Sequence, residues 1–290
     1  MVTAQTPARP NSRWAGVHVG LNVPYNYGGR MMPADQVLAN TVALGISALE
    51  MRAQPIEAFL GGPPTPGSSG SGRNPDAAVA EQIAALRKWR TSASLQKAAD
   101  LRRMYEDAGV FIEIVKWDGV FQMSDDELDY IFQLSKAVGA KGLSTETSGV
   151  EQTRRVGQFA DKHQLMIGYH GHAETGTAEY AAPFASAKFN GANVDIGHFV
   201  AGQNTSPASF IAEHASRITH LHIKDRRRNN GPNAPFGEGD TPIREILQMM
   251  RDRKFTFQAT IEFEYPVPTG STRMAEIARA IDYCRNCLLS

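Results

Sequence analysis

The sequence carries no net charge, because 30 lysine and arginine residues balance 30 aspartate and glutamate residues. Proteins that bind nucleic acids by neutralising phosphates usually have a basic excess or a basic stripe. The only dense basic run in this chain is Arg226–Arg228, and an aspartate precedes it. The composition therefore argues against a nucleic-acid-binding protein.

The chain also lacks a long apolar run and is poor in cysteine. No apolar stretch approaches the ~20 residues that cross a bilayer, and residues 1–13 contain no apolar core of a secretion signal. We therefore expect no membrane association and favour the cytoplasm; a periplasmic location would require that an export signal has been removed. The two cysteines, Cys284 and Cys287, form a single CxxC in an expected terminal helix. Without a second pair to complete a zinc site, we interpret them as inert thiols.

Short apolar runs alternate with longer segments of helical periodicity along nearly the whole chain. Eight such strand–helix repeats predict a (β/α)8 TIM barrel, an α/β fold that typically needs ~250 residues. The alternative, a doubly wound open sheet, lacks the expected Gly-x-Gly-x-x-Gly turn after an early strand. We assign residues 1–13 to an N-terminal extension and residues 14–290 to a single barrel domain. The expected strands cover residues 14–20, 46–51, 110–117, 141–145, 165–170, 192–196, 218–224 and 257–263.

Three of the connecting segments carry clear local signals. Residues 76–108 form the longest helical candidate, and Gly109 follows as a stop signal. Ser124 and Glu127 form a capping box at the start of another helix. Residues 60–75 are rich in Gly, Pro and Ser and follow the second strand. In a barrel this segment would lie at the active-site rim, either as a mobile lid or as a plain flexible insertion.

Polar residues gather at the C-terminal ends of the expected strands, where strands buried on both faces should be apolar. Side chains alternate along a strand with a period of two, so His220, His222 and Lys224 share one face. The C-terminal face of a TIM barrel carries the active site, and we expect these polar side chains to converge there. They are Lys116, Glu146, His170, His172, Asp195, His198, His220, His222, Lys224, Glu262 and Glu264.

Several carboxylates in one partly desolvated mouth are unfavourable unless something compensates their charge. One divalent cation with carboxylate and imidazole ligands would do so, and Mn²⁺, Mg²⁺, Co²⁺ and Zn²⁺ all suit such ligands. Any one of these residues alone is more often a hydrogen-bonded rim residue. The prediction of a metal site depends on their combination. Polar residues stand at the ends of five strands, and in each strand they share the face that points into the barrel.

The motifs STET, YHGH, VDIGH, HLHIKD and TIEFEY, in this order and spacing, resemble the xylose isomerase-like barrel superfamily. This superfamily includes sugar phosphate isomerase/epimerase-like proteins, ketose 3-epimerases, hydroxypyruvate isomerase, inosose dehydratase and endonuclease IV. The resemblance covers roughly residues 14–285. It implies a metal quartet of Glu146, Asp195, His222 and Glu262 that binds one divalent ion.

The resemblance also implies residues that contact the substrate. His198, three residues after the metal aspartate, matches a histidine that contacts a substrate oxygen in epimerases. An arginine soon after the seventh strand often has a similar role; Arg226, Arg227 and Arg228 all qualify, and we take Arg228 as the candidate. The remaining substrate-binding candidates are Lys116, Lys224, His170 and His172.

The activity implied by the resemblance is that of a sugar isomerase or epimerase acting on a ketose or keto-sugar through an enediolate. Glu146 and Glu262 would be its acid/base pair. The same site would serve a dehydratase or lyase that eliminates a leaving group from a 3-keto sugar or glycoside. A third reading is a non-catalytic sugar-binding barrel. The expected partner is a small carbohydrate, and the resemblance suggests a homo-oligomer.

Endonuclease IV-like activity is disfavoured for this chain. Endonuclease IV has a three-zinc site, which requires further histidines after the second and third strands and an Asp-x-His after the seventh. This sequence reads LEMRAQ and VKWDG at the first two places and has no Asp-x-His after the seventh strand. The three-zinc site cannot be assembled, in agreement with the balanced charge.

Overall fold

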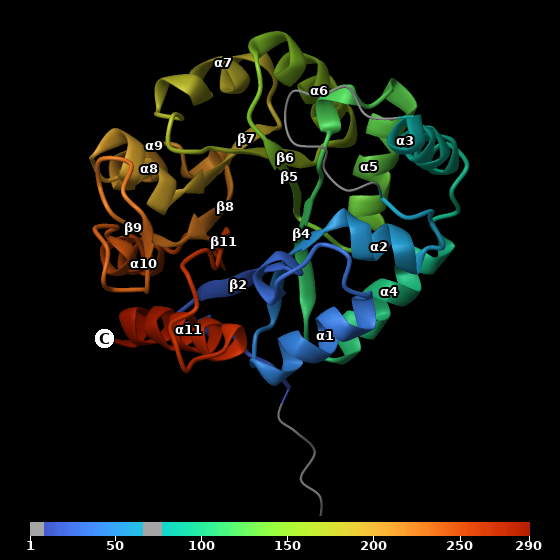
Figure 1. The fold of residues 1–290 in the computed structure, drawn as a ribbon. Coiled ribbons are helices and arrows are strands. Elements are labelled where there is room, and N and C mark those ends of the chain that lie inside the picture. The colour runs from blue at the N-terminus through green and yellow to red at the C-terminus, as the bar shows by residue number, and fades with distance from the viewer. Residues whose placement is uncertain (1–8, 66–76) are drawn as a thin grey trace, which may run out of the picture.

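The computed structural model describes residues 9–65 and 77–290 and shows a closed barrel of eight parallel strands (Figure 1). The strands follow one another around the barrel in sequence order, and the first pairs with both the second and the last, which closes the sheet. The (β/α)8 TIM barrel predicted from eight apolar runs is confirmed. The barrel strands are β2 (Val17–Val23), β3 (Ala48–Arg52), β4 (Phe111–Lys116), β5 (Gly142–Glu146), β6 (Met166–His170), β7 (Asn190–Asp195), β8 (Ile218–Ile223) and β11 (Gln258–Ile261).

Helices surround the barrel (Figure 1), and none in the described part of the chain has the length and apolar character needed to cross a membrane. Short antiparallel pairings join β1 (Arg13–Trp14) to β2, and β9 (Asp225–Arg226) to β10 (Asn233–Ala234). The helices are α1 (Ala34–Ala43), α2 (Ala53–Phe59), α3 (Ala77–Arg90), α4 (Gln96–Asp107), α5 (Asp125–Ala137), α6 (Val150–His163), α7 (Ala178–Ser186), α8 (Ile196–Gln203), α9 (Ala208–Glu213), α10 (Ile243–Asp252) and α11 (Arg273–Leu289), with 3-10 turns at Tyr25–Tyr27, Val120–Gln122 and Ala215–Arg217.

The single long helix predicted over residues 76–108 was wrong, because the chain forms two helices, α3 and α4. The break begins where Thr91 and Ser92 donate side-chain hydrogen bonds to the carbonyl oxygen of Lys88, at 3.0 and 3.3 Å. Such local bonds compete with the helical backbone ladder and favour its end. The apolar stripe continues through the break, so hydrophobic periodicity did not reveal it.

Other local predictions agree with the structure. The side chain of Ser124 accepts a hydrogen bond from the backbone of Glu127, and the glutamate reciprocates, so the capping box before α5 is confirmed. Gly109 has a φ of 80°, a left-handed conformation that favours glycine and ends the helical run. Residues 66–75 of the Gly-, Pro- and Ser-rich segment lie outside the described residues, so its role at the rim stays a prediction.

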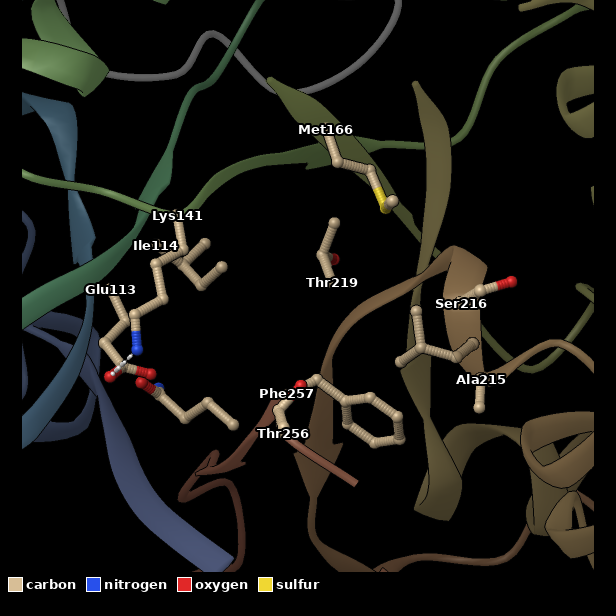
Figure 2. Close-up of a pocket in the computed structure, with 11 residues that line it drawn as sticks. Glu113, Ile114, Lys141, Met166, Ala215, Ser216, Thr219, Thr256 and Phe257 are labelled. Carbon is tan, nitrogen blue, oxygen red and sulfur yellow. Dashed lines mark hydrogen bonds and ion pairs between the residues drawn. The ribbon is translucent and has the colours of Figure 1, made fainter. Parts of the chain in front are cut away.

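The N-terminal ends of the strands surround a small pocket of about 240 Å³, shown in Figure 2. Glu113 lies on its wall and accepts a hydrogen bond from Lys141 Nζ at 2.6 Å. Its carboxylate also lies 3.1 Å from His18 Nδ1. Burial would raise the pKa of Glu113, but the hydrogen bonds and charges of His18 and Lys141 outweigh it and lower the pKa to about 2. This end of the barrel therefore holds an ionised carboxylate that stabilises the fold.

We expect Glu113→Gln to lower the free energy of unfolding at neutral pH by about 3 kcal/mol, the equivalent of the depressed pKa. A depressed carboxyl pKa stabilises the folded state above the unfolded value, and this contribution is lost as the pH falls through the folded value. The difference between the wild-type protein and the variant should therefore shrink from about pH 4.5 to about pH 2. Urea unfolding at several pH values measures it. Glu151→Gln, which removes an exposed carboxylate on α6, is the control and should change stability by less than about 0.5 kcal/mol. A pH-independent difference would contradict the assignment.

Candidate functional site

The opposite end of the barrel brings together the polar residues predicted at the strand ends. Glu146, His170 and Asp195 are the last residues of β5, β6 and β7. His222 lies near the end of β8, and Glu262 directly follows β11. Because all eight strands are parallel, these positions meet at one mouth of the barrel.

Three members of the predicted quartet converge closely. His222 Nδ1 lies 3.2 Å from Glu262 Oε2 and 3.8 Å from Asp195 Oδ2. His170 joins them, with its Nε2 3.1 Å from His222 Nδ1 and 3.4 Å from Asp195 Oδ2. One ligand atom from each of the four side chains lies within 4.8 Å of all the others, and all four residues are buried. This set is compact enough to surround one ion.

The fourth predicted ligand, Glu146, lies beside this cluster on its solvent side. Its side chain is 47% exposed, whereas that of Asp195 is fully buried. The carboxylate accepts a hydrogen bond from Lys116 Nζ at 2.6 Å and lies 2.9 Å from His172 Nε2 and 3.2 Å from His170 Nδ1. Burial would raise the pKa of Glu146, but Lys116 and the two histidines outweigh it and hold the pKa well below its usual range. Glu146 is therefore an ionised carboxylate that is partly exposed at the mouth.

Lys224 places its ammonium group among three carboxylates. Its Nζ lies 2.5 Å from Glu262 Oε2, 2.9 Å from Asp195 Oδ2 and 2.7 Å from Glu264 Oε2. Burial would lower the pKa of Lys224, but the three carboxylates outweigh it and raise the pKa above its ordinary value. Glu264 in turn accepts a hydrogen bond from the Tyr25 hydroxyl at 2.9 Å. Lys224 is therefore a fixed internal cation of the site.

His198 lies between two cationic side chains. Its Nε2 is 3.1 Å from Lys224 Nζ, and its Nδ1 is 2.6 Å from Arg226 Nη1. Burial and the charge of Lys224 lower the pKa of His198 to about 4, against the opposing effect of Asp195. His198 is therefore a neutral imidazole whose two nitrogens both face cationic side chains.

Among the three arginines after β8, Arg226 is the one beside the cluster. Arg228, the predicted substrate-binding residue, is exposed, and its backbone N–H donates to Asp240 Oδ2 at 2.9 Å. Arg227 is also exposed and lies 3.4 Å from the same carboxyl group. Strand pairing explains why Arg226 lies beside the cluster. Arg226 belongs to β9 and pairs with β10, whereas Arg227 and Arg228 belong to the turn that follows.

Sequence reasoning missed Glu50, which lies inside the barrel on β3. One carboxylate oxygen of Glu50 lies 2.5 Å from His222 Nε2, and the other lies 3.3 Å from His220 Nε2. Alternation in the second strand could have revealed it, since Leu49 and Met51 share one face and Glu50 lies on the other. The side chain escaped notice because a single glutamate in an apolar run has no sequence-local partner.

The donor set at the mouth fits a divalent cation. Two carboxylate oxygens and one imidazole nitrogen converge from Asp195, Glu262 and His222, with Glu146 beside them. Glu262 Oε2 is buried at the centre of this set, 2.5 Å from Lys224 Nζ and 3.2 Å from His222 Nδ1. Four carboxylates face the ammonium groups of two lysines, which leaves an acidic excess that a divalent cation would neutralise.

A cavity of about 550 Å³ adjoins this cluster. Glu264 forms part of its wall and connects it to the cluster through Lys224. Tyr25 and Phe263 provide aromatic faces, and Arg30 and Arg273 provide cationic groups. The mouth therefore has open space beside the cluster, on the side of Glu264.

Comparison with known proteins agrees with the fold. Residues 132–287 match the sequence profile of a family described as xylose isomerase-like TIM barrel. No curated protein matches the sequence. Solved structures that resemble this one share only low sequence identity, so the likeness shows the fold alone.

Three of these solved structures are described with different activities. A sugar phosphate isomerase/epimerase from Parabacteroides distasonis ATCC 8503 is 16% identical, with a TM-score of 0.64 over 100% of this chain and 98% of that chain. A D-psicose 3-epimerase from Clostridium cellulolyticum H10 is 13% identical, with a TM-score of 0.63 over 94% and 99% of the two chains. The probable 3-DHS dehydratase AsbF from Bacillus anthracis is 10% identical, with a TM-score of 0.64 over 92% and 98%.

We expect the purified protein to bind one divalent ion per chain. Mn²⁺ or Co²⁺ at about 100 times its dissociation constant should raise the free energy of unfolding by about 2.7 kcal/mol. Asp195→Asn should abolish this gain, because it removes one ligand charge and keeps the shape of the side chain. Thermal unfolding with and without the ion measures the effect.

Asp129→Asn is the matched control for this prediction. Asp129 also contacts a lysine and a histidine, Lys162 and His163, but on the outer helices. The gain on metal addition should persist in this variant. An equal loss in both variants, or no gain in the wild-type protein, would contradict the assignment of the ligands.

Proposed function

The chain belongs to the xylose isomerase-like TIM barrel family, and from this premise we propose that it is a divalent-metal-dependent sugar isomerase or epimerase. Its substrate would be a ketose or keto-sugar, converted through an enediolate. The observation that supports this most directly is the convergence of Asp195, His222 and Glu262 at the barrel mouth, with the ionised Glu146 on their exposed side.

In this proposal Asp195, His222, Glu262 and Glu146 would hold the metal ion. When bound, the ion would supply a positive charge that polarises the substrate carbonyl and stabilises negative charge on its oxygen. The remaining residues act on the substrate directly. Lys116 and His172 hold the carboxylate of Glu146 by its two oxygens and so fix its direction toward the mouth.

Glu146 and Glu262 would exchange protons with the substrate carbon from different sides. Glu262 is buried and reaches in from the end of β11, whereas Glu146 is half exposed and reaches in from β5. One carboxylate would remove the proton next to the carbonyl, and the other would return it to the opposite face or to the neighbouring carbon. Neutral His198, beside Lys224, would donate or accept a hydrogen bond at a substrate hydroxyl.

A second candidate is a dehydratase or lyase that uses the same proton abstraction and then expels a leaving group from the β carbon. The cavity of about 550 Å³ beside Glu264 favours it, because this space would accommodate the leaving portion of a glycoside. The candidates for the acid that would protonate that group are Lys116, Lys224, His170 and His172. Lys224 is the weakest acid among the lysines, because its three carboxylate partners raise its pKa. A non-catalytic sugar-binding barrel is the third class, and it would bind such molecules unchanged.

Incubation with free ketoses and with 3-keto glycosides in deuterated water separates these classes. Deuterium uptake with an unchanged carbon skeleton supports the isomerase or epimerase. Loss of water or of an aglycone, seen as a change in product mass, supports the lyase. Binding without either change would identify a binding protein.

We expect Glu146→Gln and Glu262→Gln to lower kcat by about 10²–10⁴-fold, because each removes one proton-transferring group. The isosteric amide keeps the shape of the side chain but cannot take the proton. Steady-state kinetics on the best substrate, with the folded state checked by circular dichroism, measures the loss. The control Glu151→Gln should retain full activity. Full activity in both site variants would show that the acid/base assignment is wrong.

A further inference from the structure

A carboxylate in the middle of the barrel lies directly below the candidate metal site. Glu50 is completely buried, and it comes from β3, which is not a neighbour of β8 in the sheet. Its two oxygens face the two histidines of β8, His222 at 2.5 Å and His220 at 3.3 Å. A buried charge that reaches across a barrel to two imidazoles needs an explanation beyond packing, because its desolvation is costly.

We propose that Glu50 is the positioning residue that orients His222 for metal binding, and that His220 anchors Glu50. The inference rests on the proposed metal site at Asp195, His222 and Glu262. It adds two residues to which no other observation assigns a role in that site, and it explains why β8 carries a second buried histidine.

The two ring nitrogens of His222 face different partners. Nδ1 faces the ligand cluster, 3.2 Å from Glu262 Oε2 and 3.8 Å from Asp195 Oδ2. Nε2 faces Glu50 on the other side of the ring, at 2.5 Å, and the side-chain amide of Asn193 lies farther from it, at 3.1 Å. Both nitrogens face a carboxylate, but the contact of Nε2 with Glu50, at 2.5 Å, is the shorter one. With an ion bound, the proton would therefore lie on Nε2 and the lone pair of Nδ1 would face the ion. A carboxylate behind the ring also makes the imidazole a more basic ligand.

Glu50 is itself held in place from the far side. Its second oxygen lies 3.3 Å from His220 Nε2, a close contact whose angles fall short of a hydrogen bond, and neither of these buried atoms has a hydrogen-bond partner among the described residues. His220 Nδ1 lies 2.9 Å from the hydroxyl of Thr219. The two imidazoles are the described side chains that the Glu50 carboxylate faces. The orientation of this carboxylate therefore depends on the orientation of both rings.

A second metal ion held by Glu50, His220 and His222 is the competing explanation, because one atom of each lies within 4.8 Å of the others. The separation of 2.5 Å between Glu50 and His222 Nε2 opposes it. Two ligands of one tetrahedral ion, with bonds of about 2.1 Å, would lie about 3.4 Å apart. The observed distance is that of a short hydrogen bond, so the carboxylate orients the imidazole instead of sharing an ion with it.

Mn²⁺ affinity of the metal-free protein, measured by isothermal titration calorimetry, tests the proposal. Glu50→Gln should weaken binding by about 10–100-fold, the usual effect of losing a carboxylate behind a metal-binding histidine. Glu113→Gln is the matched control, since Glu113 is also a buried carboxylate beside a histidine but lies at the other end of the barrel. This control should lower stability and leave Mn²⁺ affinity unchanged. The metal content should be one ion per chain.

A second measurement does not depend on a metal. In protein labelled with ¹⁵N-histidine, the Nε2 proton of His222 should exchange slowly and resonate far downfield, because it is hydrogen-bonded to a buried carboxylate. Glu50→Gln should shift this resonance upfield and speed its exchange, while Glu113→Gln should leave it in place. A general loss of structure would instead alter all the histidine signals.

The outcomes separate the two proposals. An affinity of Glu50→Gln within about two-fold of the wild-type value would overturn the positioning role, as would two ions per chain or an unchanged Nε2 resonance. If the wild-type protein binds no Mn²⁺, the metal site fails, and the resonance alone then decides whether Glu50 orients His222. If Glu50→Gln does not fold, Glu50→Asp replaces it; it keeps the charge and withdraws it from Nε2, so the same loss of affinity is expected.

Discussion

The need to compensate buried carboxylates governs the arrangement of this barrel. The geometry of parallel strands brings the acidic side chains at the ends of β7 and β11 within 4.8 Å of each other, and Glu146 at the end of β5 shares the contact of His170 with Asp195. Their mutual repulsion would oppose folding unless cations and hydrogen-bond donors lay among them. The compensating groups are two lysines and four histidines that lie among these carboxylates: Lys116, Lys224, His170, His172, His198 and His222.

The two ends of the barrel differ in how completely their buried carboxylates are neutralised. At the N-terminal end, Glu113 is matched by His18 and Lys141, and the group is complete without any further ion. At the C-terminal end, four carboxylates face only two lysines, so the group keeps an acidic excess. A complete network stabilises the fold, whereas an incomplete one is prepared to receive a charged ligand. This contrast supports chemistry at one end and stability at the other.

The sequence predicted those features that depend on periodicity and order. Eight apolar runs determined the barrel, and alternation along residues 218–224 placed His222 and Lys224 on the inner face. It could not show that Glu50 meets His222, because their contact spans 172 positions and depends on the diameter of the barrel. Nor could it choose Arg226 over Arg228, since a two-residue strand in a connecting loop determines that choice. Long-range contacts and loop conformations have no local signal.

Asp195 illustrates how closely the scaffold and the site are joined. One of its oxygens accepts the backbone N–H of His198 at 2.7 Å and starts α8, while the other faces the ligand cluster. Asparagine and serine would also start the helix but carry no charge, whereas glutamate and histidine bind metals but start helices less well. Aspartate combines both properties, a helix cap and a charge that faces the cluster, so we expect substitution of Asp195 to disturb the start of α8 as well as the cluster. Variation among relatives should therefore fall on the surrounding loops, where specificity is able to change without disturbing the start of a helix.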